Sequence, residues 1–176
     1  KALEQGFDVK LTAGTHGGCL NLLTAKNSPF GGLESLKGQT IGVTDMAGPD
    51  KNFFAILLKR HGIDPISDVQ WKVYPADLLS VALDKREIAA ISGSEPFSYR
   101  LLATGKYQLI ASNMTGDYAR LSCCVLGVSG SLARDHKPAA AALTQAILEA
   151  HSYAAAHPES VAQSFLAHAL NTNEAE

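Results

Sequence analysis

The chain has 176 residues, of which 46% are hydrophobic and 18% are charged, and this composition is typical of a globular protein of one domain or two small lobes. The formal net charge is −2 and the Lys and Arg residues are scattered, which excludes a broad basic surface for nucleic acid or for an anionic membrane. No apolar stretch approaches the roughly 20 residues that cross a bilayer.

The beginning of the chain has the pattern of a helix end followed by two strands. Residues 1–6 have the composition of the last turns of a helix that stops at Gly6. Because the sequence carries no initiator Met and no signal peptide, we expect a chain that begins inside a fold, whether processed, truncated or cut by design. Residues 7–12 predict a half-exposed strand, residues 13–18 a small-residue loop, and residues 19–25 a mostly apolar strand.

The centre of the chain alternates between strand and helix patterns. Strands are expected at 39–43, 69–74, 88–91 and 107–111, and helices at 49–61, 76–83 and 96–103. This alternation predicts right-handed βαβ units and a mainly parallel sheet with helices on both faces. A later strand is expected at 121–128, Pro138 opens a long helix, and Pro158 opens a second helix that runs to about Leu170.

The three cysteines, Cys19, Cys123 and Cys124, do not have the spacing of a zinc site. Two interpretations stay open at this point. Cys19 could form a disulfide with one of the other two in an oxidising compartment, or all three could be small buried hydrophobic residues.

Three loops carry the candidate functional residues, and we expect them at one edge of the sheet, where open α/β sheets bind ligands. The candidate binding residues are Thr15, His16, Gly17, Asp45, Ala47, Gly48, Ser94 and Glu95. For each single loop, ordinary turn chemistry is the alternative.

The loop after strand 39–43 opens directly into a helix at Pro49, so the backbone N–H groups at 47–50 and the positive end of the helix dipole are expected to hold an anionic head. Helix capping is the more ordinary role for Asp50. Glu95 is a candidate partner for a ligand amine. His16 could be a ligand donor, a general base or a loop histidine bonded to backbone. The sequence shows no metal site, and no nucleophile beside a base.

Several segments resemble one known family. They are Leu36-Lys-Gly-Gln-Thr-Ile-Gly-Val43, residues 52–63, residues 84–90, Ser94-Glu95-Pro96-Phe97, and residues 143–166 with His157-Pro158-Glu159. Together they are similar to the periplasmic solute-binding proteins of ABC transporters, in the nitrate/sulfonate/taurine-type group that also includes thiamine-pyrimidine-precursor binders. Arg86 stands where a Gly is common in that family.

The resemblance implies an α/β fold of the type II periplasmic-binding-protein kind, with two lobes and a ligand cleft between them. Residues 31–112 would form a complete second lobe, and residues 1–30 and 113–176 a partial first lobe. The chain would cross between lobes near 20–26 and 121–128.

The resemblance also implies a function. The chain would be the solute-binding component of an ABC importer, without enzymatic activity or a cofactor, for a small polar or anionic solute such as a sulfonate, taurine, nitrate or a pyrimidine precursor. Its expected partners are that solute and a membrane permease, with no nucleic acid and with self-association through the incomplete lobe. It would be periplasmic or anchored outside the cytoplasm. An enzyme of the thiamine-pyrimidine synthase type and the sensing domain of a regulator stay open as alternatives.

Overall fold

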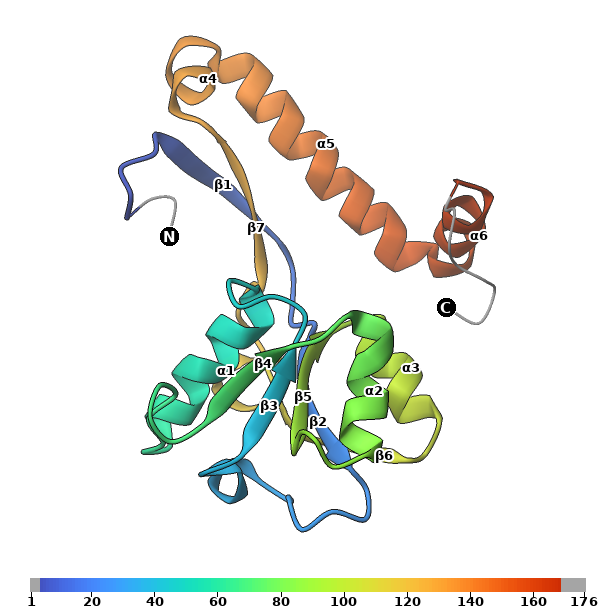
Figure 1. The fold of residues 1–176 in the computed structure, drawn as a ribbon. Helices are drawn as coiled ribbons and strands as arrows, with labels where there is room; N and C mark the ends of the chain where they lie inside the picture. The colour runs from blue at the N-terminus through green and yellow to red at the C-terminus, as the bar shows by residue number, and fades with distance from the viewer. Residues whose placement is uncertain (1–3, 169–176) are drawn as a thin grey trace. The chain divides into compact units, whose positions relative to one another are not determined.

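The computed structural model describes residues 4–168, which fall into two compact units (Figure 1). The central unit is Gly18–Ala119, and the flanking unit combines Lys1–Gly17 with Arg120–Glu176. These boundaries differ from the expected ones, which put residues 1–30 and 113–176 together. The difference arises because the strand after Gly18 pairs inside the sheet of the central unit.

The central unit is built on a five-stranded sheet in the order β4-β3-β5-β2-β6. Its strands are β2 Leu20–Ala25, β3 Thr40–Val43, β4 Gln70–Val73, β5 Ala90–Ser94 and β6 Tyr107–Ser112. Strand β3 is parallel to β4 and β5, whereas β2 is antiparallel to both β5 and β6. Four strands therefore share one direction, which confirms the mainly parallel sheet, and β2 is inserted in the opposite direction.

Helices cover both faces of this sheet (Figure 1). They are α1 Pro49–Arg60, α2 Ala76–Asp84 and α3 Phe97–Ala103, with short 3-10 helices at Leu33–Leu36 and Gly116–Tyr118. Adjacent strand residues show the two faces: Ile91 packs in a cluster with Leu79 of α2, while Ser92 bonds to Asp50 of α1. The predicted helix starts at Pro49 and Ala76 are confirmed because Pro at the first helical position and the apolar spacing are local signals.

The core of the central unit is mainly apolar, although several polar side chains are also buried in this unit. Leu22, Leu23, Ile41 and Phe54 are fully buried. At Gly42 an added Cβ atom would lie 2.6 Å from the Ile88 Cδ1 atom and 2.7 Å from the Leu79 Cδ2 atom of α2. A larger residue at this position would therefore force these two buried side chains to shift.

The flanking unit has a two-stranded antiparallel sheet of β1, Val9–His16, and β7, Cys124–Ser129. Three helices follow β7: α4 Gly130–Asp135, α5 Lys137–Ala156 and α6 Pro158–His168. The predicted loop at 13–18 was wrong, because pairing with β7 extends β1 to His16. Helix α4 was not predicted; the Ser129 hydroxyl accepts a bond from the Leu132 N–H and caps it. The predicted end near Leu170 lies outside the described residues.

Within the described residues, none of the helices combines the length and the hydropathy that a membrane span requires. Cys19, Cys123 and Cys124 form no disulfide in the described structure. Cys124 is exposed, which corrects the interpretation of all three as buried hydrophobic residues.

Candidate functional site

Two of the three candidate loops lie at the same edge of the central sheet. The β3–α1 loop contains Asp45, Ala47 and Gly48, and the end of β5 contains Ser94 and Glu95. Strands β3 and β5 are parallel neighbours, with Gly42 paired to Ile91, so both loops follow the carboxyl ends of adjacent strands. This is the position at which open α/β sheets bind ligands.

The third candidate loop belongs to the flanking unit. Thr15 and His16 are the last residues of β1, and Gly17 follows them. The expectation that all three loops share one sheet edge was therefore wrong, since β1 pairs with β7 and not with the central sheet. The exposed His16 ring has its Nδ1 atom 2.6 Å from the carbonyl oxygen of Gly17, so the ring contacts backbone as one alternative expected, but from the end of a strand and not from a loop.

The β3–α1 loop uses several of its own N–H groups. Asp45 accepts two of them: its Oδ1 atom bonds the Ala47 N–H at 2.9 Å, and its carbonyl oxygen bonds the Gly48 N–H at 3.1 Å. Pro49 has no N–H to offer. The expected anion cradle at 47–50 is thus largely occupied by an internal carboxylate and carbonyl, and the remaining amide of that stretch is that of Asp50.

Asp50 has a different role from the expected one. Gly48 is the N-cap residue of α1, with no side-chain capping bond. The Asp50 side chain is buried, and its Oδ2 atom accepts a hydrogen bond of 2.9 Å from the Ser92 hydroxyl of β5. This contact ties the first turn of α1 to the strand that carries Ser94 and Glu95.

Glu95 is an acidic group of the site with a hydrogen bond at each of its two carboxylate oxygens. Its Oε1 atom accepts from the Asn21 amide at 2.7 Å, and its Oε2 atom accepts from the Tyr99 backbone N–H at 2.8 Å. The Glu95 residue is half-buried and Ser94 is exposed. A carboxylate fixed in this way still has lone pairs that can face a ligand.

Asn21 is a site residue that the sequence did not reveal. It is 1% exposed, and its Nδ2 group also donates to the Ser98 hydroxyl at 2.9 Å. Its Oδ1 atom is buried without a hydrogen-bond partner among the described residues. The only signal in the sequence was one amide inside the apolar strand Leu20–Ala25, where a polar side chain needs partners from elsewhere in the fold.

The two loops of the central unit are acidic. Residues 44–50 and 92–97 contain Asp45, Asp50 and Glu95 and no Lys or Arg. The next cation in the sequence, Lys51, has its Nζ atom 5.5 Å from the centre of the Trp71 ring. This edge therefore favours hydrogen-bond donors and cations. Among the described residues no three His, Cys, Asp or Glu side chains lie close enough together to hold a metal ion.

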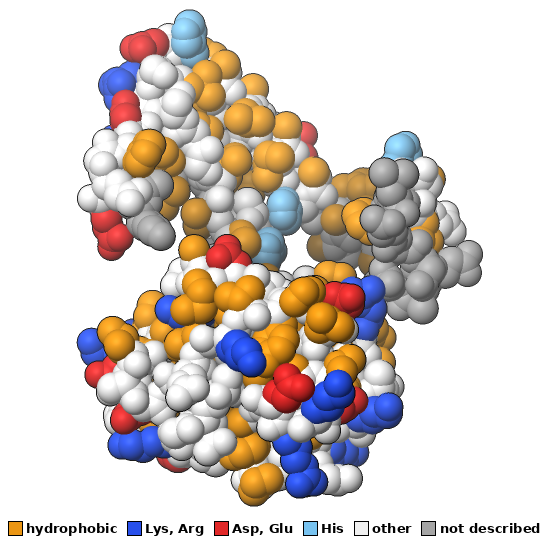
Figure 2. Space-filling view, viewed as in Figure 1, with side chains coloured by type: hydrophobic (Ala, Val, Ile, Leu, Met, Phe, Trp, Pro, Cys, Tyr) orange, Lys and Arg blue, Asp and Glu red, His pale blue; other side chains and the backbone are white. Residues whose placement is uncertain are grey.

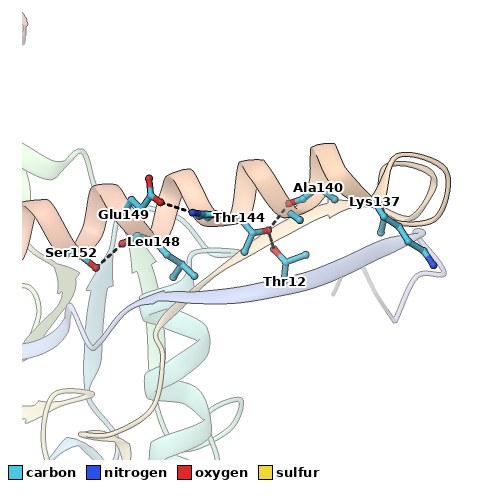
Figure 3. Close-up of a pocket in the computed structure, with 10 residues that line it drawn as sticks. Thr12, Lys137, Ala140, Thr144, Leu148, Glu149 and Ser152 are labelled. Carbon is cyan, nitrogen blue, oxygen red and sulfur yellow. Dashed lines mark hydrogen bonds between the residues drawn. The ribbon is translucent and has the colours of Figure 1, made fainter.

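The flanking unit has a groove of about 750 Å³ along α5, shown in Figure 3. Its polar groups bond to one another: the Thr144 hydroxyl donates to Thr12 at 3.0 Å, and the Gln145 amide donates to Glu149 at 2.7 Å. The rest of its wall is mainly alanine and Leu148. With these polar groups already paired, the groove suits an apolar surface better than a polar solute.

Comparison with known structures places this fold among periplasmic binding proteins. The periplasmic aliphatic sulphonate binding protein SsuA from Escherichia coli has a TM-score of 0.70 at 16% identity, over 92% of this chain and 55% of that one. The ligand-binding component of an ABC-type import system from Staphylococcus aureus has a TM-score of 0.69 at 18% identity, over 98% and 58%. The nitrate-binding protein NrtA from Synechocystis PCC 6803 has a TM-score of 0.65 at 15% identity, over 89% and 44%.

These values confirm the α/β fold of the periplasmic-binding-protein kind, and the chain spans about half the length of the structures it matches. No curated protein matches the chain. The model of the NMT1-like family matches residues 20–167, which includes the whole central unit from β2 onward and nearly all of the described helices of the flanking unit. The chain belongs to the NMT1-like family.

Proposed function

We propose that this chain is a solute-binding component of an ABC importer. Its family and its structural neighbours, which are binding proteins for sulfonate and nitrate, support this role. The observation that carries the proposal is the Glu95 carboxylate, held by Asn21 and Tyr99 where parallel strands end. The proposal also retains Thr15, His16 and Gly17 of the flanking unit as candidate binding residues.

The chemistry of the central unit narrows the solute class within this proposal. The amides of Ala47 and Gly48 are already bonded to Asp45, so a simple anion such as nitrate gains little there. Asp45 and Glu95 favour a solute with an ammonium or N–H group. Taurine and an aminopyrimidine precursor carry such groups, whereas ethanesulfonate and nitrate do not.

Calorimetric titration of the purified chain tests this proposal. Two solutes that carry an amino group, taurine and 4-amino-5-hydroxymethyl-2-methylpyrimidine, are compared with two that carry none. These are ethanesulfonate, which matches taurine without its amino group, and nitrate. We expect binding by an amine-bearing solute, weakened at least tenfold in Glu95→Gln. Absence of binding by all four solutes contradicts a solute-binding role for this class. Equal binding of taurine and ethanesulfonate, unchanged in Glu95→Gln, contradicts the assignment of Glu95.

The proposal also covers chemistry, location and the membrane partner. We expect the solute to be recovered unchanged after incubation, as in binding without turnover. The role requires a place outside the cytoplasmic membrane and docking of the ligand-bound protein on a permease. Chromatography of solute after prolonged incubation checks the first point, because a converted product would favour the enzyme alternative.

Self-association is a separate part of the proposal, supported by the apolar surface over α5. Hydrophobic side chains gather there in Figure 2, and Leu143 and Leu148 are each 43% exposed. Two copies would bury these side chains against each other. Light scattering is expected to show a dimer that Leu148→Glu dissociates and that Ile66→Glu, a control in the central unit, leaves intact. A monomer at all concentrations contradicts it.

A further inference from the structure

The central unit contains a cavity at the end of the sheet opposite the candidate site. It measures about 570 Å³, within the range of roughly 300–1,000 Å³ that is typical of small-molecule sites. Gln39 and Thr40 line it where β3 begins, and Ala89 lines it just before β5. The same two strands end at the loops of Asp45 and Glu95, so the two sites lie at opposite ends of the strands.

Arg86 lines this cavity in an unusual backbone conformation. Its φ angle is 61°, whereas the other positive-φ positions in the described chain are all glycines, such as Gly38 and Gly62. This conformation belongs to the C-terminal cap of α2, where the Arg86 N–H donates to the Leu83 carbonyl oxygen, and a non-glycine residue is disfavoured in it. In the described structure no carboxylate forms an ion pair with the Arg86 guanidinium. Its N–H groups can therefore donate hydrogen bonds to a ligand.

Two carboxylates line the same cavity beside Arg86. The Asp84 Oδ1 atom accepts a hydrogen bond of 2.9 Å from the Tyr107 hydroxyl. Burial, followed by the bond to Asp84, raises the pKa of Tyr107 to about 12, so the phenol remains a donor. The Glu87 Oε2 atom lies 3.4 Å from the Tyr74 hydroxyl. Each carboxylate keeps an oxygen that no donor of the described residues reaches, and these oxygens can receive a cation.

The remaining wall of the cavity mixes polar and apolar groups. Its polar side chains are Asn27, Ser28, Gln39 and Thr40. Ile88 and Leu83 are buried, and Phe30 is half-buried. One guanidinium, two carboxylates and the apolar side chains of Phe30 and Ile88 are complementary to a molecule with a carboxylate, an ammonium group and a hydrophobic side chain. A simple anion would meet two negative charges here, and a simple amine would leave the guanidinium without a partner.

We propose that this cavity is a second binding site, for an apolar α-amino acid. Arg86 binds the carboxylate of the amino acid, Asp84 and Glu87 bind its ammonium group, and Phe30 and Ile88 contact its side chain. The site is separate from the solute site of the proposed function and does not depend on it.

Calorimetry with leucine, isoleucine, valine, methionine and phenylalanine, each titrated singly into the full chain, tests this site. At least one is expected to bind in the millimolar range or tighter. For leucine, the matched controls are 4-methylpentanoate and isopentylamine, which each lack one charged group and are expected to bind at least tenfold more weakly. Absence of binding by all five amino acids overturns the proposal.

Arg86→Gly is the decisive variant, because glycine accepts the left-handed backbone and the fold is expected to persist. It should weaken amino-acid binding at least tenfold, and Arg86→Lys should weaken it less. Unchanged affinity in Arg86→Gly overturns the proposal. Amide chemical shifts locate the ligand independently: perturbations at 27–30 and 84–89 support the second site, and perturbations confined to 45–50 and 93–95 place the ligand at the other edge and overturn it.

Discussion

Replacing Asn21 by Asp tests the contact on which the candidate site rests. The two side chains have nearly the same shape, so the substitution changes the Nδ2 donor into a carboxylate oxygen and little else. In the structure that donor lies 2.7 Å from the Glu95 Oε1 atom and 2.9 Å from the Ser98 hydroxyl oxygen. The variant therefore places two carboxylates in contact at a position that is 1% exposed.

The expected loss in the free energy of unfolding follows from these contacts. A hydrogen bond to a charged group contributes about 1.5–3 kcal/mol, and an uncompensated buried charge costs about 3–5 kcal/mol. Since these terms overlap, we expect Asn21→Asp to lose about 4 kcal/mol at pH 7. The contact between the introduced carboxylate and Glu95 would raise the pKa of the pair above the unfolded value of about 4. The loss of stability is therefore full at pH values above the pKa of the carboxylate pair in the folded state, and it becomes smaller as the pH falls toward 4.

Urea unfolding followed by the fluorescence of Trp71 measures this loss, because the only tryptophan of the chain lies in the same unit. The double variant Asn21→Asp with Glu95→Gln is the matched control. It exchanges donor and acceptor across the same contact, and Gln can still accept from the Tyr99 N–H. We expect it to regain about 2 kcal/mol. A single variant within about 1 kcal/mol of the wild type, or a double variant that regains nothing, would refute the reasoning.

Three further predictions concern the central unit. Burial raises the pKa of Tyr107 to about 12 from 10. The neutral phenol therefore contributes its full stability to the fold below pH 10, and this contribution is lost as the pH rises to 12. Between these pH values the free energies of unfolding of the wild type and of Tyr107→Phe should come to differ by about 2–3 kcal/mol, and spectrophotometric titration should show a tyrosine that ionises near pH 12. Gly42→Ala should lower the free energy of unfolding, measured in urea, by about 1–3 kcal/mol because its Cβ would lie 2.6 Å from Ile88 Cδ1. In the control variant Gly31→Ala the added Cβ has no neighbour within 4 Å, so its free energy of unfolding should stay within about 0.5 kcal/mol of the wild type. Equal losses in the two variants would contradict the close packing at Gly42. Arg86→Gly should raise the free energy of unfolding by about 0.5–1 kcal/mol. Glycine removes the energetic cost of a side chain in the left-handed backbone conformation, and this gain exceeds the cost of the added conformational entropy of the unfolded chain. A lower free energy of unfolding in this variant would contradict the prediction.

Local signals explain which parts of the fold could be predicted from the sequence. Pro49 and Pro158 stand at helix starts because the lost N–H costs nothing there. The extension of β1 to His16 could not be predicted, because pairing with Cys124 decides it and that partner is far along the chain. The antiparallel insertion of β2 depends on distant partners in the same way.

The candidate site shows a similar limit. The sequence indicated the β3–α1 and β5–α3 loops through their small residues and their position after strands. It could not show that Asp45 bonds the amides of Ala47 and Gly48, because an Asp before a helix is compatible with capping, ligand binding and a closed turn alike. Asn21 was missed because its role depends on Glu95, a residue 74 positions away.

The reversed strand β2 has a consequence for the order in which the central unit forms. During synthesis β2 emerges before any of its partners, and both strands that flank it, β5 and β6, follow the βα units of β3 and β4. An apolar strand in this position stays unpaired until nearly the whole unit has left the ribosome, because loop closure over such a distance must precede its contacts. The Asn21–Glu95 bond then forms only when the sheet closes. A nascent chain that ends before β6 would carry helices and a partial sheet with β2 still open on one edge, at risk of pairing with other chains.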